Sequence, residues 1–136
     1  MKKLLFIFIC CFCLVGCESK GNNKDLLLGE WSYNFSDWSS KNYEFNDNNT
    51  VKYFECRHLV IGEGCVDGSA VWIGKYKLQD NIIELSNFEI DINDSYNFTN
   101  TLSGPYEKLI IDFDNMYFCN RYEGLDCSQK FEKEID

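Results

Sequence analysis

The chain has 136 residues, with 13 basic and 22 acidic side chains and a formal net charge of −9. This length suits one small domain rather than a multidomain enzyme, and the negative charge excludes a protein that binds nucleic-acid phosphates through Lys and Arg. Apolar residues make up 45% of the chain and aromatic residues 16%, which is too rich for a disordered protein. We therefore expect a small, acidic, aromatic-rich globular protein.

The first sixteen residues have the pattern of an export signal. Lys2 and Lys3 precede an apolar run over residues 4–15, which has the length of a signal-peptide core and is short for a membrane-spanning helix. The run ends in Leu-Val-Gly-Cys at residues 14–17, which resembles the lipobox of bacterial lipoproteins. This resemblance implies cleavage of residues 1–16 and acylation of Cys17, whose acyl chains would hold the protein at a membrane. The alternatives are an ordinary signal peptide or a membrane helix that contains Cys.

The residues after the lipobox predict where the protein lies. Glu18, rather than Asp, follows the expected lipidated Cys17, and in Gram-negative lipoproteins this resembles an address for the outer membrane. Because residues 18–25 are polar, we expect a flexible tether over 17–25 and a folded domain over 26–136. The expected location is the outer membrane, with the domain facing the periplasm. Without Lys2 and Lys3, 11 basic residues face 22 acidic ones, so the net charge of the exported chain is −11.

The eight cysteines fall into three groups. Three lie in the expected signal, one is the expected lipid attachment site, and the domain keeps Cys56, Cys65, Cys119 and Cys127. Four cysteines in an exported chain indicate two disulfides, for which there are three connectivities. Because each near pair flanks a loop that contains Gly, we predict the disulfides Cys56–Cys65 and Cys119–Cys127. A zinc site that also uses His58 is the alternative, although no Cys-x-x-Cys pair is present.

Apolar and polar residues alternate through most of the expected domain, which is typical of strands. Short turns rich in Asn and Asp separate several of these runs and predict hairpins. In chain order the runs are residues 31–35, 43–45, 51–55, 75–78, 82–85, 88–92, 109–113 and 116–119. One short helix is expected near residues 25–28 or after Cys127. We predict an all-β fold, a small antiparallel meander β-barrel of about eight strands stapled by disulfides, with a sandwich as the alternative.

A Gly-x-Trp motif, Gly29-Glu30-Trp31, opens the first predicted strand. This motif resembles the lipocalin signature, and the order of strands and turns over residues 28–85 is similar to that of small bacterial lipocalin-like lipoproteins. The resemblance implies a lipocalin-like barrel in which Trp31 closes one end. It also implies that Gly29 lets the chain turn tightly beneath that end.

The sequence lacks the patterns that enzymes use. It has no Gly-rich phosphate loop and no Ser nucleophile elbow, and His58, the single His, has no recognisable nucleophile or orienting carboxylate. Asp91, Asn93 and Asp94 are closely spaced oxygen donors for calcium, but they lack the rest of an EF-hand loop and suit a solvated turn better. We therefore expect a protein that is not an enzyme, with no catalytic residues, no cofactor and no metal site.

Two functions fit this sequence. The first is a non-enzymatic, lipid-anchored periplasmic protein that binds a small apolar or aromatic ligand or serves in the cell envelope. The alternative is an envelope inhibitor or immunity protein whose acidic surface binds a cationic toxin or lysozyme. Most aromatic residues should form the core, and Trp38, Trp72 and Tyr122 are the candidates for a groove or interface. A cavity inside the barrel would favour the first function, and a filled interior the second; in either case we expect a monomer that does not bind nucleic acid.

Overall fold

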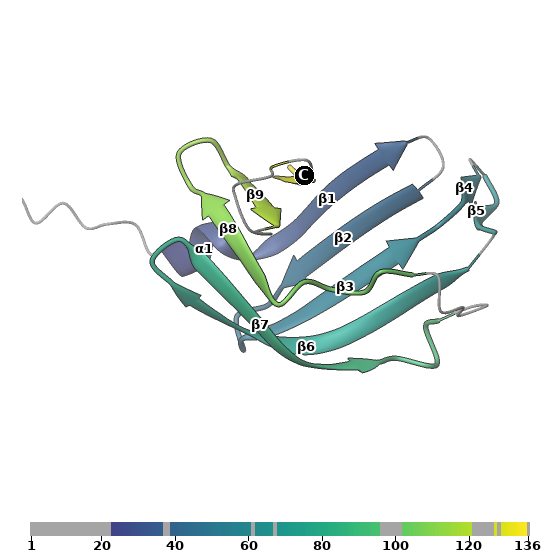
Figure 1. Cartoon of the computed structure of the whole chain (residues 1–136), viewed down its shortest axis with the longest axis horizontal. Coiled ribbons are helices and arrows are strands. Elements are labelled where there is room, and N and C mark those ends of the chain that lie inside the picture. The colour runs from purple at the N-terminus through teal and green to yellow at the C-terminus, as the bar shows by residue number, and fades with distance from the viewer. Residues whose placement is uncertain are drawn as a thin grey trace, which may run out of the picture.

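The computed structural model describes residues 23–36, 39–60, 62–66, 68–95, 102–120, 127 and 129–135. Its elements, in chain order, are α1 Asn23–Leu27, β1 Gly29–Ser36, β2 Ser39–Phe45, β3 Thr50–Cys56, β4 Leu59–Val60, β5 Gly64–Cys65, β6 Ser69–Gln79, β7 Ile82–Ile90, β8 Lys108–Asp112, β9 Tyr117–Asn120 and β10 Lys130–Lys133. Eight strands form a closed antiparallel barrel in the order β1-β10-β9-β8-β7-β6-β3-β2, and β4 and β5 form a separate two-stranded ribbon (Figure 1). The predicted all-β antiparallel barrel is confirmed.

The ends of the described chain differ in detail from the sequence-based expectation. The short helix α1 begins at Asn23 and therefore includes the last residues of the expected tether. The tail after Cys127, the other place proposed for a helix, contains the strand β10. This strand pairs with β1 through Trp31 and Lys133 and with β9 through Phe131 and Phe118, so it closes the barrel. The two runs predicted at 82–85 and 88–92 form the single strand β7, which ends at Ile90.

A row of aromatic side chains crosses the barrel interior from β1 to β6. The strand register places Trp31, Tyr43, Tyr53 and Trp72 opposite one another on neighbouring strands, and all four are buried. The ring centres of Tyr43 and Tyr53 lie 4.6 Å apart, and those of Tyr53 and Trp72 lie 5.4 Å apart. From β10, the Phe131 ring approaches Tyr43 at 5.2 Å. At this level, aromatic rings fill the barrel interior, as the dense packing of protein cores requires.

The helix α1 lies at the end of the barrel away from the β4–β5 ribbon (Figure 1). Leu27 of this helix is fully buried, and its carbonyl oxygen accepts a hydrogen bond of 2.8 Å from the indole N–H of Trp31. The ammonium of Lys133 donates to the Leu26 carbonyl oxygen at 2.8 Å and lies 5.7 Å from the Trp31 ring centre. Gly29, with a φ of 110°, joins the helix to β1 in a conformation that favours glycine. These contacts hold α1 against the barrel beside Trp31.

The two disulfides pair the cysteines as their spacing predicts. Cys56 at the end of β3 is bonded to Cys65 in β5, with their Cα atoms 5.9 Å apart. Cys119 in β9 is bonded to Cys127, with their Cα atoms 5.1 Å apart. Because these thiols are joined in pairs, they do not form the alternative zinc site. A cross-link over a loop this short stabilises a fold by about 2.5 kcal/mol in the chain-entropy description.

A bulge in β7 depends on a glycine in β6. The pairing of β6 with β7 shifts between Ile73 and Lys75, and Asn87 in the bulge has a φ of 56°. The ring of Phe88 lies directly on Gly74, where an added Cβ would come within 2.6 Å of the ring carbon Cδ1. Because Gly74 has no side chain, the Phe88 ring beside the bulge can pack directly against β6.

We expect Gly74→Ala to destabilise the barrel by about 1–3 kcal/mol, because the new methyl overlaps the Phe88 ring. Urea unfolding with the disulfides intact measures this change. In a Phe88→Ala background the same substitution should cost much less, because the overlapping ring is gone. Equal losses in the two backgrounds would show that the contact does not cause the destabilisation.

Candidate functional site

A carboxylate lies inside the barrel next to the aromatic row. Glu55 in β3 is only 7% exposed, and its neighbours across the sheet are Lys41 in β2 and Ala70 in β6. Its oxygen Oε2 accepts a hydrogen bond of 3.0 Å from the Tyr53 hydroxyl. A buried carboxylate destabilises the fold unless hydrogen-bond donors surround it. The segment that supplies the other donors to Glu55 must therefore pack at this end of the barrel.

The other donors come from the strap, which we define as residues 102–107 before β8. The backbone N–H of Ser103 donates to Glu55 Oε1 at 3.2 Å, and that of Gly104 donates to Oε2 at 3.1 Å. The Ser103 hydroxyl also contacts both carboxylate oxygens, and it accepts a hydrogen bond of 2.8 Å from the Lys41 ammonium. Further along, the Tyr106 N–H donates to the Tyr43 hydroxyl at 3.1 Å. The strap therefore crosses the barrel in front of β2 and β3 (Figure 1).

The tyrosines beside the strap stay in their neutral form. Burial raises the pKa of Tyr53 well above its usual range, and the nearby Tyr43 and Glu55 raise it further. Burial also raises the pKa of Tyr43, although the hydrogen bond from the Tyr106 backbone lowers it in part. A neutral Tyr53 keeps the proton that it donates to Glu55, so this hydrogen bond does not lose its donor at physiological pH.

A second polar site, the acidic hollow, opens on the outer side of β1, β2, β3 and β6 and measures about 430 Å³. Its lining residues are Glu30, Asn42, Glu44, Lys52, Phe54, Val71 and Asp94. Glu30 and Glu44 lie directly opposite each other across β1 and β2, and the Lys52 ammonium lies 3.7 Å from the Asp94 carboxylate. Asn42 donates to Glu30 at 3.0 Å, while its own side-chain oxygen is buried without a partner among the described residues. One lysine thus faces three carboxylates, so the hollow is electronegative.

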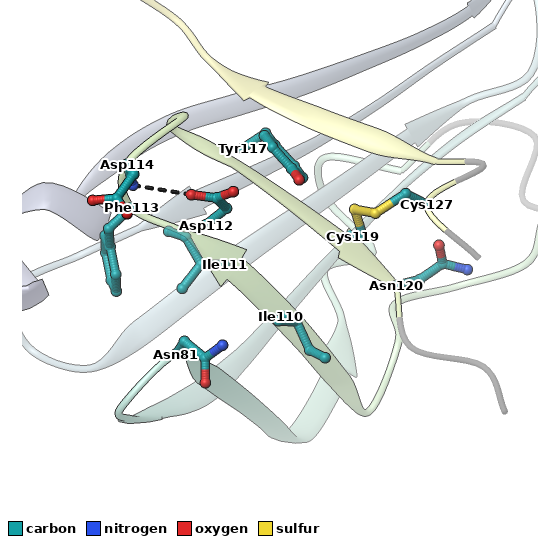
Figure 2. Close-up of a pocket in the computed structure, with 10 residues that line it drawn as sticks. All are labelled: Asn81, Ile110, Ile111, Asp112, Phe113, Asp114, Tyr117, Cys119, Asn120 and Cys127. Atoms are coloured by element: carbon teal, nitrogen blue, oxygen red, sulfur yellow. Dashed lines mark hydrogen bonds between the residues drawn. A yellow bond between two sulfur atoms is a disulfide. The ribbon is translucent and has the colours of Figure 1, made fainter. Parts of the chain in front are cut away.

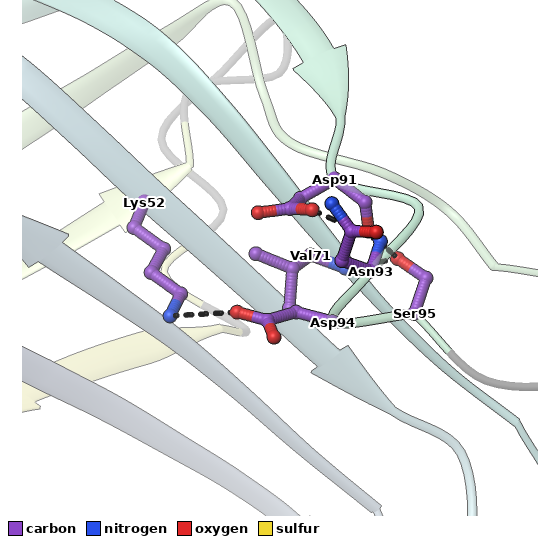
Figure 3. Close-up of polar contacts among 6 residues, drawn as sticks. All are labelled: Lys52, Val71, Asp91, Asn93, Asp94 and Ser95. Atoms are coloured by element: carbon purple, nitrogen blue, oxygen red, sulfur yellow. Dashed lines mark hydrogen bonds and ion pairs between the residues drawn. The ribbon is translucent and has the colours of Figure 1, made fainter.

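The acidic residues considered for calcium hold a turn after β7 instead (Figure 3). The Asp91 carboxylate accepts a hydrogen bond of 3.0 Å from the Asn93 N–H, and the Ser95 hydroxyl donates to the Asp91 carbonyl oxygen at 2.6 Å. Asp94 points toward Lys52. Across the described ranges, no group of three or more His, Cys, Asp or Glu side chains is arranged to hold a metal ion.

A third site, the outer groove, measures about 510 Å³ and lies along β8 and β9 (Figure 2). Its lining residues are Asn81, Ile110, Ile111, Asp112, Phe113, Asp114, Tyr117, Cys119, Asn120 and Cys127. The carboxylates of Asp112 and Asp114 lie toward one end, and Asn120 lies beside the disulfide at the other end. Ile110 is the apolar side chain between them. The groove therefore has an apolar centre and carboxylates at one end.

The remaining residues singled out in the sequence are distributed as follows. His58 follows β3 and is half-buried, and its carbonyl oxygen accepts a hydrogen bond of 2.9 Å from the Val66 N–H. Trp72 belongs to the core, whereas Trp38, Tyr122 and the expected lipidation site Cys17 lie outside the described residues. Of the chain that the structure describes, no helical part is long and apolar enough to cross a bilayer.

Comparisons with protein-family models, with curated proteins and with solved structures return no match to this chain.

Sequence reasoning missed Glu55 and the strap, although one signal was present. Val51, Tyr53 and Glu55 alternate along one strand, and a period of two places all three on the same face. Because Val51 and Tyr53 belong on the core side, the pattern predicts that Glu55 is a buried carboxylate with hydrogen-bond donors close by. The source of those donors could not be read from the chain, since Ser103 is 48 residues away.

We expect Glu55→Gln to destabilise the protein by about 1–3 kcal/mol, because an amide nitrogen would then face N–H groups that need an acceptor. Glu44→Gln, at an exposed position in the neighbouring strand, should stay within about 0.5 kcal/mol of the parent. Urea unfolding of both variants gives the comparison. If the two variants were equally stable, the carboxylate would not be what holds the strap.

Proposed function

We propose that this chain is a lipid-anchored protein of the cell envelope whose lipocalin-like barrel binds its target on the outside. The target that the surface suits best is a cationic protein, which makes the chain an inhibitor or immunity-type protein. The proposal combines the lipobox at residues 14–17 with the barrel and with the acidic surface.

The packing of the barrel interior carries this proposal. The aromatic row and the rings of Phe118 and Phe131 occupy the middle of the barrel, and these two rings lie 4.9 Å apart. The strap occupies the end next to that row, where Glu55 and the Tyr43 hydroxyl hold it. A ligand in the lumen would have to displace well-packed rings or a hydrogen-bonded segment, whereas a target on the outer wall would displace only water.

The charge of the outer wall indicates the chemistry of the target. The net charge of −11 on the exported chain attracts a cationic partner over several ångströms and raises its rate of association. In the acidic hollow, Phe54 and Val71 lie beside Glu30, Glu44 and Asp94. A Lys or Arg side chain of the partner suits this hollow, since its stem can pack on apolar side chains while its charge meets carboxylates.

Lipidation at Cys17 can be tested on the chain in its bacterial host. Metabolic labelling with a clickable palmitate analogue should label the parent chain, because the thiol is the acyl acceptor. Cys17→Ala should abolish the label and release the domain from the membrane fraction. Cys13→Ala, a cysteine change inside the expected signal, is the matched control and should label normally. Label that survives in Cys17→Ala would exclude this anchor.

Binding of a cationic lysozyme tests the acidic surface. We expect Glu30→Gln/Glu44→Gln to weaken association about tenfold, which corresponds to about 1.4 kcal/mol, because two carboxylates of the hollow are lost. Glu63→Gln/Asp80→Asn removes the same charge from exposed positions elsewhere and should change affinity much less. Biolayer interferometry at low and high salt supplies the affinities, and affinity should fall as salt screens the charges. Association that survives high salt, or equal losses in both double variants, would contradict the proposal.

A further inference from the structure

The end of the barrel that carries α1 is the end nearest to the expected lipid. Only residues 18–22 separate Cys17 from Asn23, the first residue of α1. The six residue steps from Cys17 to Asn23 span about 20 Å when a chain is fully extended. An acyl group on Cys17 would therefore keep the start of α1 within about 20 Å of the membrane surface.

The helix α1 is fixed to the barrel by contacts along its length. Its last residue, Leu27, is fully buried and accepts the hydrogen bond from the Trp31 indole. The ammonium of Lys24 donates to the Asp47 carbonyl oxygen at 2.6 Å, which joins α1 to the turn between β2 and β3. From the end of β10, Lys133 also donates to a carbonyl oxygen of the helix. The position of α1 thus determines which end of the barrel is tied to Cys17.

Two apolar side chains are exposed at this same end. Leu26 in α1 is 41% exposed, and Ile135, just after β10, is 93% exposed. Ile135 lies here because the backbone N–H of the preceding Glu134 donates at 2.9 Å to the carbonyl oxygen of Glu30, near the start of β1. Exposed aliphatic side chains beside a lipid attachment point can enter the headgroup region of a bilayer and strengthen the contact.

The charged side chains near these two apolar residues almost cancel. We define the anchor face as Lys24, Asp25, Leu26, Lys133, Glu134 and Ile135, which contains two lysines and two carboxylates. The neighbouring Asp47, Lys77 and Asp80 add one net negative charge beside Lys24. The exported chain as a whole has a net charge of −11. A nearly neutral face suits zwitterionic headgroups, whereas the acidic chain would be repelled by anionic lipid.

The length of the barrel disfavours the opposite orientation. β6 has 11 residues and runs from Ser69, at the ribbon end, to Gln79, at the α1 end. At about 3.3 Å per residue and a tilt of about 40°, its two ends lie about 25 Å apart along the barrel axis. If the β4–β5 ribbon lay on the membrane, α1 would be farther from the surface than the roughly 20 Å that the chain from Cys17 can span.

We propose that the anchor face lies on the surface of a zwitterionic bilayer, with Leu26 and Ile135 in the headgroup region. The β4–β5 ribbon then points away from the membrane. This orientation rests on the proposed lipid anchor at Cys17.

Relaxation of methyl resonances by a paramagnetic lipid tests this orientation. The chain is purified from the membranes of its bacterial host, and its intact mass shows whether Cys17 is acylated. It is then placed in phosphatidylcholine nanodiscs that contain a gadolinium-chelating lipid, with the lutetium chelate as the blank. Leu26 and Val66, which follows β5 in the ribbon, have similar exposed fractions of 41% and 38%. We expect the relaxation enhancement at the Leu26 methyl groups to be at least tenfold that at the Val66 methyl groups.

Two isoleucine variants locate the contact. Ile135→Asp places a charge in the anchor face and should lower the enhancement at Leu26 two- to fivefold. Ile92→Asp makes the same change after β7, at a position that is 81% exposed, and should leave this enhancement unchanged. Because both side chains are largely exposed, both variants should keep the fold. Replacing about a third of the lipid with phosphatidylglycerol should also lower the enhancement at Leu26, because anionic headgroups repel the acidic chain.

The possible failures are distinguishable. A mass that shows unmodified Cys17 would overturn the proposed anchor and this orientation together. An acylated chain with equal enhancements at Leu26 and Val66 would overturn the orientation alone. Equal effects of Ile135→Asp and Ile92→Asp would show that the anchor face is not the contact, and a larger enhancement at Leu26 with phosphatidylglycerol would overturn the assignment to zwitterionic lipid.

Discussion

The barrel is organised around a carboxylate that cannot be buried without donors. Glu55 points into the interior beside the aromatic row, and two successive backbone N–H groups of the strap, those of Ser103 and Gly104, satisfy it. To reach it, the chain before β8 has to leave the wall of the barrel. The pairing of β7 with β8 accordingly covers only Ile82–Glu84, and one further backbone hydrogen bond, from Leu85 to Glu107, links β7 to the strap. The hydrogen bonds between Glu55 and the strap thus determine which segment fills this end of the barrel. They also determine how far β7 pairs with β8.

The buried aromatic row leaves the outer wall as the surface for the proposed binding. In a barrel with an open lumen, inward side chains can shape a ligand site and outward ones face solvent. Here the inward positions of β1, β2, β3 and β6 carry Trp31, Tyr43, Tyr53 and Trp72, whose buried rings pack against one another. The outward positions carry the opposed carboxylates of Glu30 and Glu44, the Asn42 side-chain oxygen that has no partner among the described residues, and the apolar centre of the outer groove. The proposed target site therefore consists of outward-facing residues.

The parts of the fold that follow from local alternation could be predicted from the sequence, and those that depend on distant contacts could not. Hairpins such as the one turning at Asp80, with its φ of 54°, are marked by Asn and Asp between alternating runs. β10 has only four residues, and it is recognisable as a strand only because β1 and β9 lie on either side of it. The strap has no periodic pattern, because Glu55 rather than a neighbouring strand fixes its path. The acidic hollow and the outer groove likewise combine strands whose adjacency is a property of the closed barrel.

The strand order places the two outer sites on different walls of the barrel. The acidic hollow lies on β1, β2, β3 and β6, whereas the outer groove lies on β8 and β9, and β7 and β10 separate these two sets. The described residues that line the two sites do not overlap. Sites that share no contacting residues are expected to bind independently, unless the core between them can switch between two packing arrangements. The close-packed aromatic interior argues against such coupling, since packed rings transmit a change only by repacking. The two sites also differ in their lining, because the hollow has three carboxylates around one lysine, whereas the groove has an apolar centre at Ile110 and carboxylates at one end. A partner side chain that enters the hollow, as proposed, therefore need not disturb the groove.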